Sequence, residues 1–460
     1  MKVIASLPFL LMIGGVLMIS CSGDDASAPT TIASADSAIA PFTIQTLPNG
    51  LDVIVKEAHA APIVAVYLWC KTGSVNETPR EEGISHFYEH MFFKGTEKRG
   101  VGEIDRAIKS LGGYNNAFTS KEYTAYYVVL PSENFTLAAD VLVDAIRNPL
   151  FPADEIEKER GVIKEEINRK EDDPTGTLYE ELFAAMFPYT PYAHPVLGTK
   201  ESAEQITRED FANYLAKFYI PNNLTAVVVG DVDTKVAVAE LERLTTGWES
   251  DPGVAGRKAS FTVPDYEGVG EFSLEMDVNM SYVMLAFRTS GYGDERENAT
   301  LDAVSSVMGE GRSSRLYRRI IEEERIASSV QAFIYPLTRT GLFIIMGTME
   351  PEMVPRFREV VLEEIGKLRN QAIPADELNK VKTMLRADFQ FANETDADIA
   401  MTLGHYHTLG RLDEVTEYER SINAVTIDEI RRYVIATLNP ESYSFGVINP
   451  LSSERGGDVR

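Results

Sequence analysis

A segment from the first half of the chain recurs in the second half, and this repeat limits the fold more than any other feature. Residues Thr207 to Pro221 match Thr426 to Pro440 at an offset of 219, and Pro152 to Lys158 match Pro374 to Lys380 at an offset of 222. Near-equal offsets at two separated places indicate a duplicated domain. A chain of 460 residues with 44% hydrophobic content is long enough for each copy to have its own core.

The fold class follows from the order of the expected elements. Asn49 and Gly50 stand before an alternating apolar segment and predict a tight hairpin between antiparallel strands. Further strands are expected at 64–71, 124–130 and 223–229, and helices at 152–170 and 207–218. Ser132 is expected to cap the helix that follows the strand at 124–130. Because strands and helices alternate around antiparallel pairing, we predict an α+β fold.

A short helix in the first copy carries two histidines and a glutamate. His86 and His90 are four residues apart, so both imidazoles can lie on one helix face and bind the same ion. Glu89 lies at the edge of that face, where it can hydrogen-bond a metal-bound water. The pattern His-x-x-Glu-His is the signature of the inverzincin zinc peptidases. The alternative is two surface histidines on an ordinary amphipathic helix.

A third ligand is expected on the charged helix at 152–170. Glu159 and Glu166 are seven residues, or two turns, apart and share a face. Two neutral imidazoles and one carboxylate would leave the fourth position of Zn2+ open, as catalytic zinc sites require. An apolar stripe is expected to pack this helix on one side; it comprises Ile156, Val162, Ile163 and Ile167.

With these two motifs in place, the chain resembles the pitrilysin/insulinase family of zinc peptidases, especially the branch similar to mitochondrial processing peptidase. The resemblance implies one Zn2+ per chain, bound by His86, His90 and Glu166. It also implies that Glu89 is the general base on a zinc-bound water and that Glu159 lies just outside the ligands. Glu165 is the rival of Glu166, and its position relative to the apolar residues at 162–163 favours Glu166.

The same resemblance implies the architecture and the substrate. The family's fold has two homologous domains that enclose a cleft, each with a mostly antiparallel sheet covered by helices. We expect the catalytic domain at 42–248, a linker at 249–264 and an inactive homologous domain at 265–455. An extended peptide would add as a strand along a sheet edge, which the resemblance locates at Asn116 and Ala117. The alternative for Asn116 is a loop amide that caps a turn.

The second copy has lost the metal-binding residues. Val381 stands where Glu159 does, Asp388 stands where Glu166 does, and 305–311 contains no histidine. His405 and His407 are two residues apart, so they would face different sides of a helix and are interpreted as structural.

A homologous partner subunit is expected because the C-terminal copy also lacks two residues that bind the substrate in the resembling family. In the resembling family this copy supplies an Arg and a Tyr that grip the substrate, but the aligned positions here are Ile321 and Ser328. We therefore expect a heterodimer with a non-catalytic homologue that brings the Arg and Tyr pair. A homodimer in which Arg318, Arg319 or Arg325 substitutes is the alternative.

The N-terminus predicts export. An apolar run from Val3 to Ile19 suits a signal peptide at 1–20, and Leu17 to Cys21 resembles a bacterial lipobox with Cys21 as the lipidated residue. Plain secretion or an uncleaved anchor is the alternative. Residues 21–41 are expected to be a flexible tether. The protein would then lie on the periplasmic side of a bacterial cell envelope, attached to the membrane only through its lipid. Cys70, the one other cysteine, is expected to be a buried thiol.

The net charge of −26 argues against nucleic acid as a partner, because a phosphate surface would be repelled. The sequence therefore favours a metalloendopeptidase that acts on peptides or small unfolded proteins. Two other classes stay open: a non-catalytic structural subunit of a larger complex, and a peptide-binding lipoprotein that uses zinc only for folding.

Overall fold

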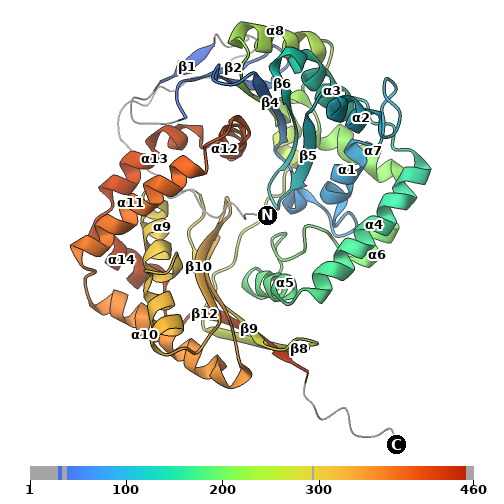
Figure 1. Cartoon of the computed structure of the whole chain (residues 1–460). Coiled ribbons are helices and arrows are strands. Elements are labelled where there is room, and N and C mark those ends of the chain that lie inside the picture. The colour runs from blue at the N-terminus through green and yellow to red at the C-terminus, as the bar shows by residue number, and fades with distance from the viewer. Residues whose placement is uncertain (1–28, 34–38, 293–294, 452–460) are drawn as a thin grey trace, which may run out of the picture.

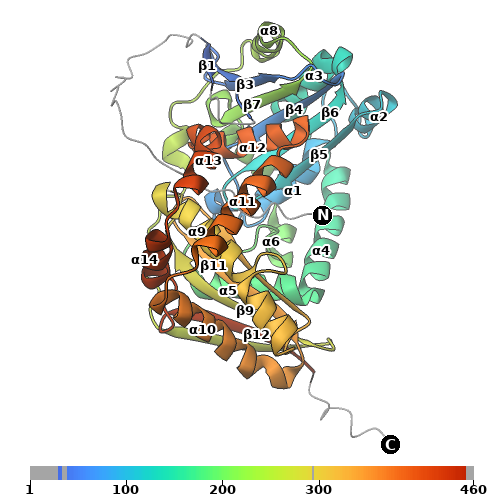
Figure 2. The same cartoon turned by 60° about the vertical axis from the view of Figure 1, so that its left-hand side comes forward.

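The computed structural model describes residues 29–33, 39–292 and 295–451. They form two sheets with helices on both faces (Figures 1 and 2). The strands of the first sheet are β1 Thr30–Ile32, β2 Phe42–Thr46, β3 Asp52–Glu57, β4 Ile63–Cys70, β5 Tyr114–Thr119, β6 Thr124–Pro131 and β7 Leu224–Gly230. Those of the second are β8 Val269–Met276, β9 Ser281–Thr289, β10 Ser329–Pro336, β11 Gly341–Met349 and β12 Tyr443–Pro450.

The helices alternate with these strands. In the N-terminal half they are α1 Ile84–Phe92, α2 Glu103–Ser110, α3 Phe135–Arg147, α4 Ala153–Asp172, α5 Pro174–Met186, α6 Lys200–Gln205, α7 Arg208–Phe218 and α8 Thr234–Thr245. In the C-terminal half they are α9 Glu295–Gly309, the π-helix η5 Tyr317–Glu323, α10 Val354–Asn370, α11 Ala375–Phe391, α12 Asp396–Thr408, α13 Leu412–Ala424 and α14 Ile427–Thr437.

The two sheets have the same topology. The first has the order β1-β2-β3-β7-β4-β6-β5 and the second has β10-β11-β9-β12-β8, which is the order β5-β6-β4-β7-β3 of the first. In each sheet one pair is parallel, β3 with β7 and β8 with β12, and the other pairs are antiparallel. The predicted α+β fold and the duplication are therefore confirmed.

Alternate residues of each central strand face opposite helix layers. In β4, Val64, Val66 and Leu68 pack against helices of the N-terminal half, whereas Tyr67 and Trp69 face the other way. The second layer comes from the opposite half of the chain. Helix α12 covers β4 and β7, and helix α5 covers β9 and β12. The two helices start at equivalent positions of the repeat, so the halves exchange one helix each (Figures 1 and 2).

The closest contact of this exchange is at Gly404 of α12. A Cβ atom at Gly404 would lie 1.9 Å from Nε1 of Trp69, so only glycine lets the helix approach the first sheet this closely. The hairpin turns of the two halves also meet, because the backbone N–H of Thr338 donates to both oxygens of Glu122, at 2.9 and 3.0 Å. The halves are thus joined by packing and by hydrogen bonds.

Several local expectations are wrong. Ser132 does not cap α3, which begins at Phe135; its hydroxyl donates to Asp231 instead. Val162 is 41% exposed, so it is not part of the apolar stripe of α4. Part of the expected tether is a paired strand, since β1 binds β2 through residues 30–32, where Thr and Ile favour extended backbone.

Of the remaining expectations, the one for Cys70 is confirmed, and those for the N-terminus fall on residues that the structure does not describe. Cys70 is a fully buried free thiol, as expected. Cys21 and the signal segment 1–20 lie outside the described residues. In the described ranges no helix combines the length and the apolar character needed to cross a membrane. The domain boundaries stay predictions.

Candidate metal centre

Helix α1 begins at a sharp turn whose backbone N–H groups are hydrogen-bonded by the carboxylate of Glu77, which lies shortly before the helix. Gly83 precedes it with φ of 87°, a left-handed conformation that suits glycine. Glu77, 7% exposed, accepts hydrogen bonds from the backbone N–H groups of Gly83 (2.7 Å) and Ser85 (2.8 Å). These are helix-end donors that have no partner inside the helix. Glu77 therefore fixes the start of the histidine helix, a role that the sequence analysis missed.

The apolar side of α1 leaves its two histidines and its glutamate on one face. Ile84, Phe87, Tyr88, Met91 and Phe92 are buried against the sheet and α7. His86, Glu89 and His90 are half-buried on the opposite side, which faces α4. The spacing of the apolar residues thus determines where the histidines point.

Helix α4 completes a three-residue cluster. Oε2 of Glu166 lies 3.5 Å from Nε2 of His86 and 3.5 Å from Nε2 of His90. Among the described residues, His86, His90 and Glu166 are the one group whose ligand atoms lie within 4.8 Å of one another. Glu165 is exposed and accepts a hydrogen bond from Asn168. The structure therefore brings Glu166, and not Glu165, to the histidines.

These donors suit Zn2+. Two imidazole nitrogens and one carboxylate oxygen are a usual catalytic set for this ion. Ligands about 2.1 Å from a tetrahedral ion lie about 3.4 Å apart, close to the 3.5 Å separations found here. Burial, with the charges of His90 and Lys170, lowers the pKa of His86 to about 3. His86 is therefore neutral at physiological pH, which is the form that binds metals.

Glu159 orients His90 by contacting Nδ1, the ring nitrogen that does not face Glu166. Its Oε2 lies 2.9 Å from Nδ1 of His90, and its Oε1 accepts a hydrogen bond from Nζ of Lys94 at 2.5 Å. When Nδ1 donates to this carboxylate, Nε2 keeps its lone pair for a metal. Burial opposes ionisation, but the hydrogen bonds from His90 and Lys94 lower the pKa of Glu159. Glu159 thus lies outside the cluster of three, and it is itself held by Lys94, a residue that the sequence analysis did not single out.

Glu89 is close to the cluster without joining it. The hydroxyl of Thr119, the last residue of β5, donates to Oε2 of Glu89 at 2.6 Å. Burial raises the pKa of Glu89, and the hydrogen bond from Thr119 partly offsets the rise. A half-buried carboxylate with a raised pKa beside these three candidate ligands is suited to take up and release a proton.

Asn116 and Ala117 lie on an edge strand, not in a loop. Strand β5 is the last strand of its sheet and pairs with β6 on one side only. Oδ1 of Asn116 accepts a hydrogen bond from the backbone N–H of Ala117 at 3.0 Å. This strand therefore leaves one edge available for another strand, and the turn-capping alternative does not apply.

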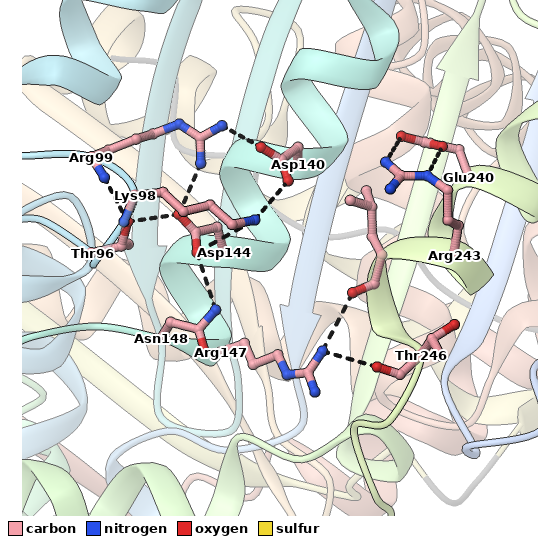
Figure 3. Close-up of polar contacts among 11 residues, drawn as sticks. Thr96, Lys98, Arg99, Asp140, Asp144, Arg147, Asn148, Glu240, Arg243 and Thr246 are labelled. Atoms are coloured by element: carbon pink, nitrogen blue, oxygen red, sulfur yellow. Dashed lines mark hydrogen bonds and ion pairs between the residues drawn. The ribbon is translucent and has the colours of Figure 1, made fainter.

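The loop after α1 is anchored to α3 (Figure 3). Asp144 accepts hydrogen bonds from the side chains of Thr96 (2.6 Å), Arg99 (2.8 Å) and Asn148 (3.1 Å), and its own side chain is 1% exposed. Lys94 lies between α1 and Thr96, so this network holds the residue that reaches Glu159. The spacing of these residues in the sequence offers no signal for the network.

The C-terminal half contains no such cluster among the described residues. Val381 is buried and Asp388 is exposed on α11. In η5, Ile321 is half-buried, and the hydroxyl of Ser328, beyond the helix, donates to the carbonyl oxygen of Thr348. Neither can supply a guanidinium or a phenol.

The three arginines near η5 differ in their surroundings. Arg319 forms ion pairs with Glu324 (2.5 Å) and Glu363 (3.1 Å). Arg318 and Arg325 are exposed. Only the last two therefore have guanidinium groups that solvent reaches freely.

His405 and His407 bind the opposite half of the chain. Nδ1 of His405 lies 3.0 Å from the hydroxyl of Tyr123, and Nδ1 of His407 lies 3.0 Å from the hydroxyl of Thr225. Both contacts join α12 to the first sheet. These positions agree with the structural role that was expected.

The fold and the cluster define a class, the two-domain metallopeptidases with inverted zinc motif. Residues 52–200 match the insulinase (peptidase family M16) model, and residues 205–385 match the peptidase M16 inactive domain. An uncharacterized zinc protease of Rickettsia bellii is 30% identical over 89% of this chain and 98% of its own length. The chain therefore belongs to peptidase family M16, the pitrilysin/insulinase family.

Two further similarities agree with this assignment. A probable mitochondrial-processing peptidase subunit beta of Arabidopsis thaliana is 28% identical over 90% of this chain and 79% of its own length. The crystal structure of a protease from Helicobacter pylori superposes with a TM-score of 0.84 at 25% identity, over 89% of this chain and 99% of that one. The similarity thus covers both halves of the molecule.

Proposed function

We propose that this chain is a zinc metalloendopeptidase that hydrolyses peptides or small unfolded proteins. The proposal rests on the gathering of His86, His90 and Glu166 around one point, with Glu89 beside them. A Zn2+ ion bound by these three residues would lower the pKa of a water molecule and polarise the carbonyl of a peptide bond. Relatives that are zinc proteases support this assignment.

Each residue of the site has a distinct role in this proposal. Glu89 takes the proton of the attacking water and gives it to the leaving amine. Glu159, supported by Lys94, keeps the ring of His90 in one orientation. A peptide would add as a strand to the free edge of β5 at Asn116 and Ala117, and a metal held by the three ligands would polarise the carbonyl of its scissile bond.

Metal analysis and peptide cleavage test this function together. The purified protein should contain one zinc per chain and cleave a mixture of unfolded polypeptides. Glu89→Gln should keep the metal and lose roughly 100-fold to 10,000-fold in rate, because it removes the base and leaves the ligands. Glu165→Gln is the matched control on the exposed face of α4 and should change neither property.

The outcomes separate this function from its alternatives. Zinc without any cleavage by the wild type would favour the peptide-binding class. Absence of both zinc and cleavage would favour a structural subunit. Full activity of Glu89→Gln would show that the assigned base is wrong.

We also propose that a homologous subunit completes the enzyme. Ile321 and Ser328 occupy the positions where the resembling family has Arg and Tyr, and Arg319 is held by two glutamates. The Arabidopsis relative is itself a subunit of a processing peptidase. Loss of one such donor typically costs about 3 to 4 kcal/mol of transition-state stabilisation. Peptidase activity should therefore rise when a co-expressed homologue is added.

One result would contradict the proposal of a partner subunit. The lone chain would have full activity, and this activity would not change when Arg318, Arg319 and Arg325 are replaced. That outcome would rule out both the heterodimer and the homodimer.

The last part of the proposal concerns location. We propose that the mature protein begins at a lipidated Cys21 on the periplasmic side of a bacterial envelope, because an apolar run ends directly before this cysteine. Intact-mass analysis of the membrane fraction should show acyl groups and loss of residues 1–20. A soluble product with unmodified Cys21 would contradict it.

A further inference from the structure

Strand β5 presents its two faces to different parts of the molecule. The side chains of Asn115, Ala117 and Thr119 point toward the helix layer that contains α1 and α2. Nδ2 of Asn115 donates to Asp105 of α2 at 2.9 Å, and Ala117 packs on the helix-side core. Thr119 is the third residue in this series, and its hydroxyl reaches Glu89 of α1. The strand that has the free edge therefore also contacts the expected base.

The contact between Thr119 and Glu89 is short and well supported. Oγ1 of Thr119 lies 2.6 Å from Oε2 of Glu89, and no other hydrogen bond reaches this carboxylate from the residues that the structure describes. The next residue closes the hairpin, because the backbone N–H of Ser120 donates to the carbonyl oxygen of Tyr123 at 2.8 Å. The backbone N–H of Ser74 also donates to the carbonyl oxygen of Ser120. The backbone beside Thr119 is thus held from two sides.

The residue type fits this task. A β-branched side chain in a strand has few χ1 rotamers, so a threonine hydroxyl loses little entropy when it is fixed in one direction. A buried carboxylate with one fixed donor has a defined orientation, whereas the same carboxylate without the donor can rotate about its last two torsions.

We propose that Thr119 is the positioning residue for the general base and that it links peptide binding on β5 to the placement of Glu89. This inference rests on the proposed function, in which Glu89 is the base and a peptide adds to β5. A peptide backbone bound at Asn116 and Ala117 would stiffen the strand two residues before Thr119 and so restrict Glu89. Thr119 acts through Glu89 and does not itself touch the reacting atoms.

Three variants test this role. Thr119→Val removes the hydroxyl and keeps the shape, and Thr119→Ser restores a hydroxyl. Thr124→Val makes the same change at the opposite position of the hairpin, where the hydroxyl donates to the carbonyl oxygen of Thr72 and not to Glu89. Crystal structures of the metal-free proteins would locate the Glu89 carboxylate, and steady-state kinetics would give kcat and KM.

The expected results differ between variants. In Thr119→Val the Glu89 carboxylate should move from its present position, and kcat should fall roughly 10-fold to 100-fold with KM within about twofold, because a small misplacement of a reacting group has a large effect. Thr119→Ser should restore both, and Thr124→Val should keep kcat. An unmoved carboxylate in Thr119→Val, an effect on KM alone, or no rescue by serine would overturn the proposal.

The failure of the proposed function would look different. Full activity of Glu89→Gln would remove the base assignment, yet the position of the Glu89 carboxylate in Thr119→Val would still decide whether Thr119 holds this side chain. The structural measurement therefore stands without any activity of the enzyme.

Discussion

The two halves of the molecule share one sheet topology, but the helices at equivalent positions have different polar side chains between them. In the N-terminal half, α1 and α4 bring together two histidines and a glutamate, and one of the histidines, His90, is also held by Glu159. In the C-terminal half, the corresponding region has carboxyl groups instead: Asp302 on α9, Glu310 directly after it, and the exposed Asp388 on α11. Burial raises the pKa of Asp302 well above its usual range and the charge of Glu310 adds to this. Burial, and then the charge of Asp388, raises the pKa of Glu310.

This difference separates what the shared backbone determines from what individual side chains determine. The duplicated sheets and helices place side chains at fixed positions, and the identity of a few side chains decides whether a metal can bind there. Buried carboxyl groups such as Asp302 are protonated more easily, and a protonated carboxyl is a poor ligand. The C-terminal copy thus keeps the frame of the site and has lost its ligands.

The largest expected effect comes from equivalent substitutions in the two copies. Glu166→Gln should weaken zinc binding by more than roughly 100-fold, because even residues outside the ligand shell change metal affinity by about 10 to 100-fold. Asp388→Asn, the equivalent change in the second copy, should leave zinc affinity unchanged. Competition with a zinc chelator measures both.

A reversed result would change the ligand assignment. Retention of zinc by Glu166→Gln, with loss in Glu165→Gln, would show that α4 is rotated relative to α1 when the metal binds. The comparison of the two copies would then have to use the neighbouring position.

Local patterns in the sequence predicted much of this site. Helix geometry predicts that His86 and His90 share a face and that Glu159 and Glu166 share a face, whereas the choice of Glu166 as the ligand came from the family resemblance. The duplication predicted two equivalent sheets, because it depends only on matching segments. The Asn49 and Gly50 hairpin predicted the antiparallel pairing of β2 and β3.

What the sequence could not show depends on contacts between distant segments. The apolar residues of α5 and α12 predict burial, but nothing in their spacing says that each helix packs on the opposite half. Thr119 reaches Glu89 only because β5 lies beside α1, and Lys94 reaches Glu159 only because α4 crosses the end of α1. Val162 is exposed, so the buried face of α4 is narrower than the spacing of its apolar residues suggested.

The second prediction compares how each half anchors the segment near its site. Asp144→Asn should lower the free energy of unfolding by about 3 to 5 kcal/mol, because it removes a buried carboxylate that binds an arginine. Glu363→Gln weakens the partly exposed pairs of Glu363 with Arg319 and Arg356 in the C-terminal half and should cost less than about 1 kcal/mol. Urea unfolding followed by tryptophan fluorescence measures both.

Equal effects would contradict this contrast. In that case the two anchors would contribute alike, and burial of the Asp144 side chain would not explain its importance. Arg243→Ala offers a second surface comparison, since Arg243, whose pair with Glu240 is shown in Figure 3, is itself largely exposed.

The third prediction compares an exchanged helix with a helix that stays in its own half. Gly404→Ala in α12 should destabilise the protein by about 1 to 3 kcal/mol, because its Cβ would lie 1.9 Å from the Trp69 ring. Gly366→Ala in α10 has nothing within 4 Å of the new Cβ and should stabilise by about 0.5 to 1 kcal/mol. Thermal unfolding of both variants tests this difference, and an unchanged melting temperature in Gly404→Ala would show that α12 can shift away from the sheet.

The smallest effect concerns the pH dependence of the two exchanged helices. Helix α12 contacts the first sheet through His407, where α5 has Ala185, so only one of the two contacts can titrate. Burial lowers the pKa of His407 to about 4; the charge of Lys71 adds to this and that of Asp52, 3.5 Å away, opposes it. Between about pH 6.5 and 4 the unfolded chain therefore binds more protons than the folded one, and stability falls as the pH falls.

His407→Gln keeps a partner for Thr225 and removes the titration. The wild type should lose about 2 kcal/mol of stability at pH 5 through this histidine, and the variant should not, so the two unfolding curves should differ at pH 5 and converge above pH 7. His59→Gln is the control, because His59 is exposed and its partners Asp231 and Glu57 raise its pKa, which gives the opposite sign. Identical acid dependence in the wild type and His407→Gln would show that α12 keeps its contact with the first sheet whether or not this imidazole is charged. The acid sensitivity would then come from the other buried histidines, among them His405, whose pKa burial also lowers to about 4 and which faces the hydroxyls of Tyr123 and Tyr292.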